Sequence, residues 1–248
     1  MASTAGLREP SLVLRSLDGA REVELDAERP LYPASMIKTP LAAAALALAA
    51  AGKLELKGAV TVEEQNMTAN DLPSPLVPGY RARISELIDL MITQSDNVAT
   101  NVLIDVVQRE RATALLHELG FSETAIRRKL SGSDPLIDDP GASGRNTHPA
   151  HEAARLFEEL AHERLPLSSI LLDALARQRW NTKLSRGLSP GDRFAHKTGD
   201  TSEVSHDGGI LTTANGRSYV LVVYTSMPSS DEVDASFAAF MRALRPHL

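Results

Sequence analysis

The sequence predicts an α+β fold in which strands from the two ends of the chain share one antiparallel sheet and the middle forms a helical part. Strand-like runs occur near both ends, and segments with apolar residues at helical spacing fill the middle. A last amphipathic helix closes the chain. We expect residues 1–248 to form a single domain, with an α/β part at about 1–34 and 190–248 and a helical part at about 35–189.

The chain opens with a predicted hairpin and a long apolar helix. Residues 11–17 and 21–25 alternate as strands do, and the Asp-Gly dipeptide between them is typical of a tight hairpin turn. Residues 39–51 are mostly Ala and Leu, both strong helix formers, and they stop at Gly52, a residue type that suits a helix end. We therefore expect two paired strands followed by a central helix.

The middle of the chain is predicted to be mainly helical up to a long loop. Between residues 84 and 119, apolar side chains recur at helical spacing, with Ser85 and Asp96 as expected N-caps of successive helices. Residues 126–146 are rich in Gly and Pro and show no periodicity. Long loops without secondary structure often carry function in compact domains, so this loop is a candidate functional segment.

Helices return after the loop, and strands follow them. The expected helices are residues 149–163, 168–178 and 231–244, and the expected strands are residues 194–197, 208–213 and 218–225. The Asn-Gly dipeptide at residues 215–216 predicts a hairpin between the last two strands. A groove between the sheet and the helical part is the natural place for a binding site.

Composition excludes several classes of protein. The chain has 26 Lys and Arg against 32 Asp and Glu, a formal net charge of −6, which argues against binding nucleic acid or an anionic membrane through bulk charge. With 43 % hydrophobic and 23 % charged residues, the chain is neither disordered nor fibrous. It has no Cys, so it has neither a thiolate nucleophile nor a Cys-ligated metal site.

No segment is expected to cross a membrane or to act as an export signal. The longest apolar run, residues 41–51, is shorter than the roughly 20 residues that a transmembrane helix needs. The first ten residues lack the apolar core of a signal peptide. We therefore expect either a cytoplasmic protein or an exported one whose signal has been removed.

Ser35 and Lys38 form the first of three polar groups along the chain. Residues three apart at the start of a helix share one face, so the Lys38 amine is expected to reach the Ser35 hydroxyl. A serine hydroxyl needs a base to take its proton, and lysine serves as that base when burial or nearby positive charge lowers its pKa. Taken alone, the pair equally describes a helix cap beside a solvated lysine.

Two further groups change this interpretation. A Ser-Asp-Asn tripeptide starts at Ser95, where one helix ends and the next begins, and a Lys-Thr-Gly tripeptide starts at Lys197 at the end of a strand. Each tripeptide alone is explained by a helix cap or a turn. Together, and in this order, the S-x-x-K, S-D-N and K-T-G groups resemble those of the class A β-lactamase and penicillin-binding serine hydrolase superfamily.

The resemblance extends beyond the three groups. Residues 97–103, 184–191 and 206–211 also look like this superfamily, and the similarity runs from about residue 11 to the C-terminus. It implies a β-lactamase/transpeptidase-like fold, with an antiparallel sheet flanked by helices and an all-helical subdomain, forming one catalytic domain.

The resemblance implies a serine acyl-transfer site. Ser35 would be the nucleophile, Lys38 would act in its activation, and Ser95 would pass a proton to the leaving nitrogen. Asn97 would steady Lys38 and hydrogen-bond an amide of the substrate.

The resemblance also implies a set of substrate-binding residues. Beside Asn97, these are Lys197, Thr198, Gly199 and Asp200. Lys197 and Thr198 would bind a substrate carboxylate, and the backbone N–H groups of Ser35 and Asp200 would form the oxyanion hole. The acidic side chain of Asp200 beside this pocket is expected to alter substrate preference. Candidates for a second carboxylate contact are Arg186, Arg193 and Arg217.

One loop departs from the class A pattern. Class A enzymes hold the water that hydrolyses the acyl-enzyme on a loop glutamate, whereas residues 127–139 contain no Glu. Asp134 is the nearest substitute, either as a catalytic carboxylate or as a turn-forming residue before a proline. The stretch 128–130 looks like β-lactamase-related serine hydrolases that lack this glutamate. We expect an acyl-enzyme at Ser35 with weak or selective deacylation.

These observations predict a serine hydrolase of the β-lactamase type that breaks down or binds β-lactams, with antibiotic resistance as the associated role. The alternatives are an esterase or peptidase acting on a non-lactam substrate, and a penicillin-binding sensor module without turnover. The expected partner is a small molecule, namely a β-lactam, ester or peptide, and not nucleic acid. No cofactor and no metal are expected, because the histidines lack the carboxylate spacing of a zinc site.

A monomer is expected, with a dimer as the alternative. The last predicted helix carries an apolar stripe at Val233, Phe237, Phe240 and Met241. This stripe is expected to pack on the sheet of its own chain, and a second copy would cover it otherwise.

Overall fold

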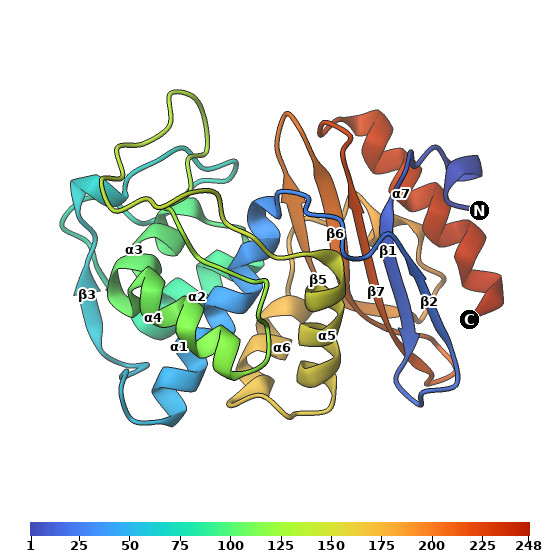
Figure 1. Cartoon of the computed structure of the whole chain (residues 1–248), viewed down its shortest axis with the longest axis horizontal. Helices are drawn as coiled ribbons and strands as arrows, with labels where there is room; N and C mark the ends of the chain where they lie inside the picture. Colours follow the sequence, from blue (N-terminus) through green and yellow to red (C-terminus); the bar gives the residue numbers. More distant parts are fainter.

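The computed structural model describes all 248 residues and contains a five-stranded antiparallel sheet in the order β2-β1-β7-β6-β5 (Figure 1). The strands are β1 (Ser11–Ser16), β2 (Glu22–Leu25), β5 (Arg193–Asp200), β6 (Ser205–Thr212) and β7 (Ser218–Thr225). Because β1 pairs with β7, the two ends of the chain meet in one sheet, which confirms the predicted fold class.

Seven α-helices and five short 3-10 helices accompany the sheet. The α-helices are α1 (Lys38–Ala50), α2 (Ile84–Thr93), α3 (Asn97–Val107), α4 (Arg109–Glu118), α5 (Ala150–Ala161), α6 (Ser168–Ala176) and α7 (Asp231–Leu244). The 3-10 helices are η1 (Ser3–Ala5), η2 (Ala34–Ile37), η3 (Glu64–Asn66), η4 (Leu184–Gly187) and η5 (Arg245–His247). A second, two-stranded sheet joins β3 (Ala59–Thr61) to β4 (Arg81–Arg83), and the sequence did not predict it because three-residue strands show no alternation.

Helix α1 runs through the helical part and carries the first polar group at its start. Ten of its thirteen residues are buried, and it packs against α2, α3 and α4. A helix that is apolar all round is expected in such a central position. The Ala side chains are small enough to let the neighbouring helices approach closely. The polar residues Lys38 and Thr39 therefore begin a helix whose other residues are apolar.

The sheet is covered on both faces. In Figure 1, α7 lies on one face, with both chain termini near it, and the helical part lies on the other. Alternation along β7 sends Leu221 and Val223 into the cluster with α7, whereas Val220 and Val222 join the larger core with α5. The apolar stripe on α7 is buried against this sheet, as expected, so the stripe itself gives no reason to expect a dimer.

Of the two predicted helix caps, the structure confirms one and contradicts the other. Asp96 caps α3 as predicted, because its Oδ1 accepts the N–H of Ala99 at 2.8 Å. The cap predicted at Ser85 is wrong, since α2 already begins at residue 84. Strand β4 runs directly into α2, so Arg83 takes the cap position, and its N–H donates to Glu86 Oε2 at 3.3 Å.

The predicted long loop is present between α4 and α5. It contains no helix or strand, and a pair of backbone hydrogen bonds joins Ala125 to Thr147. Arg109 on α4 holds its far side through an ion pair with Asp139 at 2.9 Å. Backbone hydrogen bonds and this ion pair thus hold the loop against the helical part. None of the helices combines the length and apolar character needed to cross a membrane.

Candidate active site

A cavity of about 990 Å³ lies between the end of β5, the turn before α1 and the long loop. Six of the predicted site residues line it, namely Ser35, Ser95, Asn97, Asp134, Thr198 and Asp200. The other three, Lys38, Lys197 and Gly199, are buried. The fold therefore brings all three polar groups of the sequence to one place.

Ser35 lies in η2, on a turn that β5 approaches closely. Ala34 before it has a φ of 48°, in the left-handed region that non-glycine residues seldom adopt. A Cβ at Gly199 would stand 2.9 Å from the carbonyl oxygen of Pro33 and 3.2 Å from the backbone nitrogen of Met36. Glycine is thus required there because it lets the strand lie against the turn that carries the serine.

Lys38 is fully buried and is held by the second polar group. Its Nζ lies 2.6 Å from the backbone oxygen of Ser95, 3.0 Å from Ser95 Oγ and 2.7 Å from Asn97 Oδ1. Lys38 thus has hydrogen-bond partners on both Ser95 and Asn97. The amine makes no hydrogen bond to Ser35, which lines the cavity.

Ser95 lies between two lysines. Lys197 Nζ approaches Ser95 Oγ at 3.0 Å from the side of β5 and also donates to the backbone oxygen of Thr198 at 2.8 Å. Ser95 has a φ of 59°, and such strained backbone in a non-glycine residue is often found at functional sites.

Burial changes the ionisation of both lysines. Burial, with the neighbouring charge of Lys197, places the pKa of Lys38 well below its ordinary value of 10.5. Burial also lowers the pKa of Lys197 from 10.5 to about 7. A lysine with a lowered pKa is a neutral amine over more of the physiological pH range. Lys38 therefore meets the requirement for a proton acceptor beside Ser35.

Asn97 is already engaged on both sides of its amide. Its Oδ1 accepts from Lys38, and its Nδ2 donates to the backbone oxygen of Ala69 at 3.0 Å. Its backbone N–H donates to Asn70 Oδ1 at 2.6 Å. A substrate amide would have to share or displace the Ala69 contact.

Asn101 on α3 contributes to the cavity wall, although the sequence did not single it out. Its Oδ1 accepts the N–H of Leu130 at 2.8 Å, and its Nδ2 donates to the Leu130 carbonyl at 3.0 Å. Leu130 is thereby fixed on the inner wall of the cavity, on the loop that lacks a glutamate. The available signal was an Asn inside an apolar helix, since buried amides need partners.

Asp134 lies on the exposed part of the same loop. It lines the cavity but makes no hydrogen bond to Ser35, Lys38 or Asn97. The structure thus brings Asp134 to the rim of the cavity and Leu130 to its inner wall.

Lys183 is a second cavity residue that the sequence did not single out. Its side chain is 3 % exposed, and its Nζ lies 2.5 Å from Asp200 Oδ2 and 3.3 Å from Asp234 Oδ1. The next residue is anchored, because the N–H of Leu184 donates to Asp207 Oδ2 at 3.0 Å. Lys183 belongs to no recognisable sequence motif, so only the folded structure shows that it lines the cavity.

The three arginines expected as a second carboxylate contact do not line the cavity. Arg193 begins β5 at the end opposite Asp200, and Arg217 lies at the turn between β6 and β7. Arg186 lies in η4, three residues beyond the lysine that does line it. That expectation is therefore wrong, because strand length and turn position take these side chains away from the site.

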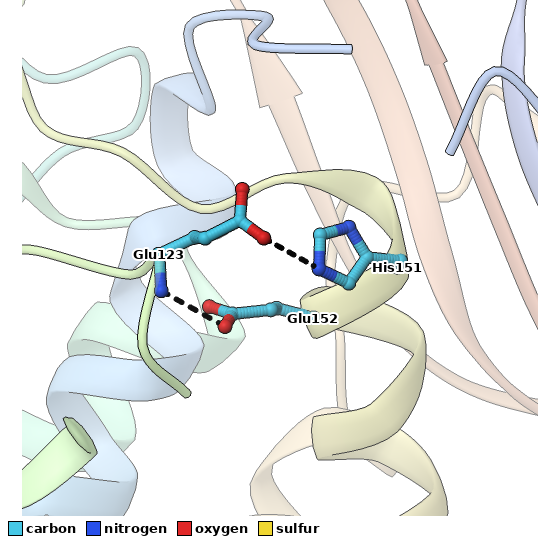
Figure 2. A group of neighbouring side chains, drawn as sticks. All are labelled: Glu123, His151 and Glu152. Atoms are coloured by element: carbon cyan, nitrogen blue, oxygen red, sulfur yellow. Dashed lines mark hydrogen bonds and ion pairs between the residues drawn. The ribbon is translucent and has the colours of Figure 1, made fainter. Parts of the chain in front are cut away.

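Another group of titratable side chains lies outside the cavity, where the loop after α4 meets the start of α5 (Figure 2). Glu152 accepts the N–H of Glu123 at 2.9 Å and the hydroxyl proton of Thr124. His151 lies with Nε2 3.2 Å from Glu123 Oε1 and with Nδ1 3.2 Å from the carbonyl oxygen of Ala27. These hydrogen bonds account for the grouping and tie the loop to α5.

The sequence model of the beta-lactamase enzyme family matches residues 1–244. The chain belongs to this family. The resemblance drawn from the three polar groups is thereby confirmed.

Individual members of the family are similar over most of the chain. The extended-spectrum beta-lactamase PER-1 of Pseudomonas aeruginosa is 24 % identical over 209 residues, which cover 77 % of this chain and 66 % of PER-1. This beta-lactamase-family chain thus spans about two thirds of the length of that relative.

Solved structures have the same fold. PBP-A is 26 % identical with a TM-score of 0.83, and the match covers 96 % of this chain and 90 % of PBP-A. An ancestral class A β-lactamase is 26 % identical with a TM-score of 0.84, covering 100 % and 96 % of the two chains. A leucine-to-glutamate mutant of PBP-A has been solved as an acyl-enzyme complex with penicillin G.

Proposed function

We propose that the protein is a serine hydrolase that is acylated at Ser35 by β-lactams or related acyl compounds and releases the acyl group slowly. The observation that carries this proposal is the pair of buried lysines that meet at Ser95, beside Ser35 and in the wall of one cavity. A neutral amine, a bridging hydroxyl and a nucleophilic hydroxyl are the groups that acyl transfer requires.

The acylation step follows from these groups. Ser35 Oγ bonds to the substrate carbonyl carbon while its proton moves to the neutral Lys38 amine. The carbon–nitrogen bond breaks when Ser95 gives its proton to the leaving nitrogen and takes one back from Lys38. Backbone N–H groups of Ser35 and Asp200 stabilise the oxyanion. Because catalytic hydrogen bonds often tighten only in the substrate complex, we expect the Lys38 amine to turn toward Ser35 on binding.

Slow release follows from the inner wall of the cavity. Hydrolysis of an acyl-enzyme needs a base that takes a proton from the attacking water. The wall position that Asn101 fixes carries the apolar side chain of Leu130, and the nearest loop carboxylate, Asp134, is exposed on the rim. Asp134 is the only carboxylate among the loop residues that line the cavity, so the loop holds no carboxylate on the inner wall to activate water.

The relatives support the same class of reaction. They include a β-lactamase that is 24 % identical to this chain and a PBP-A mutant, 26 % identical, solved as an acyl-enzyme with penicillin G. On that basis we propose that penicillins also acylate this chain. We attribute the slow release of the acyl group to the loop between α4 and α5.

Leu130→Glu is expected to speed deacylation about 100-fold, because it places a carboxylate at the fixed wall position. The measurement is the decay of the benzylpenicillin adduct by intact-protein mass spectrometry. Leu136→Glu is the matched control, since it adds a carboxylate to the same loop and cavity at an exposed site without the Asn101 anchor.

Equal decay rates in wild type, Leu130→Glu and Leu136→Glu would contradict the assignment of slow release to Leu130. Asp134→Asn tests the other loop position. If Asp134 were the water-activating base, this change would slow adduct decay at least tenfold. We expect no change of that size.

Acylation by an anionic penicillin is expected to weaken as the pH rises through about 7, because Lys197 loses its charge there. A base with a lowered pKa is protonated only below that pKa, so the ammonium that attracts a carboxylate is present on the acid side. The second-order acylation rate constant should fall by roughly tenfold per pH unit well above this pKa. Lys197→Arg should remove the fall, since arginine stays charged. If the acylation rate constant of Lys197→Arg falls by the same amount with pH, the pH dependence arises from another group.

An esterase acting on a non-lactam substrate is the second candidate function. The carboxylate of Asp200 beside Lys183 favours it, because a penicillin would bring its own carboxylate to the same wall.

A further inference from the structure

Asp200 faces the cavity at the end of β5. Thr198 and Asp200 both line the cavity, while Gly199 between them lies against the turn that carries Ser35. This is the alternation of side chains along a strand. The carboxylate of Asp200 therefore stands on the same wall as the hydroxyl of Thr198, one step further along.

Both oxygens of this carboxylate are held. Oδ2 lies 2.5 Å from Lys183 Nζ, and Oδ1 accepts the hydroxyl proton of Ser205 at 3.0 Å. Lys183 is nearly buried and has Asp234 as its second anion at 3.3 Å. Lys183, the cation on this wall of the cavity, is thus already paired with carboxylates of the protein.

The surroundings of this pair are acidic. The carboxylates on the wall that β5, the following turn and α7 form are Asp200, Glu203, Asp231 and Asp234. Arg145, which reaches the cavity from the long loop, is paired with Glu203 at 2.8 Å. Arg128 comes from that loop as well, and Lys129 is paired with Asp105 at 2.7 Å. An incoming carboxylate at the Lys183 wall would therefore meet a neutralised cation and further negative charge.

This wall lies on the leaving-group side of the site. Under the proposed function, Ser95 gives a proton to the leaving nitrogen, and Lys197 connects Ser95 to Thr198 on β5. In a penicillin, the ring carboxylate is attached beside that nitrogen. This carboxylate, which Lys197 and Thr198 are expected to bind, would lie next to Asp200 at the end of β5. There Asp200 already occupies the second cation that could contact it, Lys183.

We propose that Asp200 is a specificity-determining residue, which occupies Lys183 in place of a substrate carboxylate and so directs the enzyme to acyl compounds whose leaving group is uncharged. This inference rests on acylation at Ser35. The expected substrates are neutral esters, thioesters or amides. Compounds that carry a carboxylate on the leaving group should acylate Ser35 more slowly.

Benzylpenicillin and its methyl ester test this, since they differ only in the charge of that carboxylate. The measured quantity is the ratio of their second-order rate constants for acylation, free acid over ester, by intact-protein mass spectrometry. We expect a ratio below one in the wild type and a ratio at least about tenfold higher in Asp200→Asn, because the amide no longer neutralises Lys183. Adding Lys183→Ala to Asp200→Asn should cancel the gain.

Asp231→Asn is the matched control, since it removes a carboxylate from the same wall at a residue that does not contact Lys183. Its ratio should rise far less than in Asp200→Asn, because Lys183 stays paired with Asp200. An unchanged ratio in Asp200→Asn, or an equal rise in Asp231→Asn, would overturn the role of Asp200 while leaving acylation intact. A wild type that forms no Ser35 adduct with either compound would instead overturn the proposed function, and this inference with it.

Discussion

Ser35→Ala is expected to abolish covalent labelling by benzylpenicillin, with a loss of at least about 10³-fold in the rate of acylation. Ser35 is the cavity hydroxyl at the turn before α1, next to a buried lysine whose pKa is lowered by burial. Removing the nucleophile leaves no covalent route, however well the substrate binds. Intact-protein mass spectrometry after incubation with millimolar-range penicillin measures the effect.

Other serines line the same cavity and supply the control. Ser133→Ala removes a hydroxyl from the long loop, away from both lysines, and should be labelled like the wild type. Peptide mapping of the wild-type adduct should locate it on the segment that contains Ser35. Labelling of Ser35→Ala at the wild-type rate would assign the reaction to a different residue.

Lys38→Met is expected to lower the acylation rate constant by about 10²- to 10⁴-fold, the usual contribution of a positioned general base. Methionine fills the buried space without an amine, so Ser95 and Asn97 lose their shared hydrogen-bond partner and Ser35 loses its proposed proton acceptor. The variant should remain folded, because burying an apolar side chain avoids the desolvation cost of a buried lysine. Stopped-flow acylation and thermal unfolding measure these two outcomes separately.

Lys53→Met is the control for this change, since Lys53 is exposed just beyond the end of α1. Its acylation rate should match that of the wild type. A folded Lys38→Met variant that is acylated at the wild-type rate would show that another group takes the proton from Ser35.

Local patterns were sufficient to predict the sheet and the helices. Strand alternation near both ends and the apolar composition of α1 are short-range properties, and the structure reproduces them. The β3-β4 pair was not predictable because a strand of three residues carries too little pattern. The cap of α2 moved from Ser85 to Arg83 because a preceding strand determines where that helix begins.

The candidate site was predictable where its residues lie in short motifs and not where tertiary contacts decide their place. Ser35, Ser95 and Lys197 come together as the motif order indicated. Leu130 is placed by a side chain from α3, and Lys183 by an anchor between η4 and β6, contacts that span 29 and 23 residues of sequence. Such contacts leave no local periodicity, so their residues become visible only in the fold.

The lifetime of the acyl-enzyme tests the central claim most directly. The wild-type protein is incubated with benzylpenicillin, the excess is removed, and the intact mass is followed over time. We predict one adduct on Ser35 that persists for hours, because no carboxylate is held on the inner wall to activate water. An adduct that disappears within seconds would contradict slow release, and a protein that never gains the mass of penicillin would contradict acylation itself.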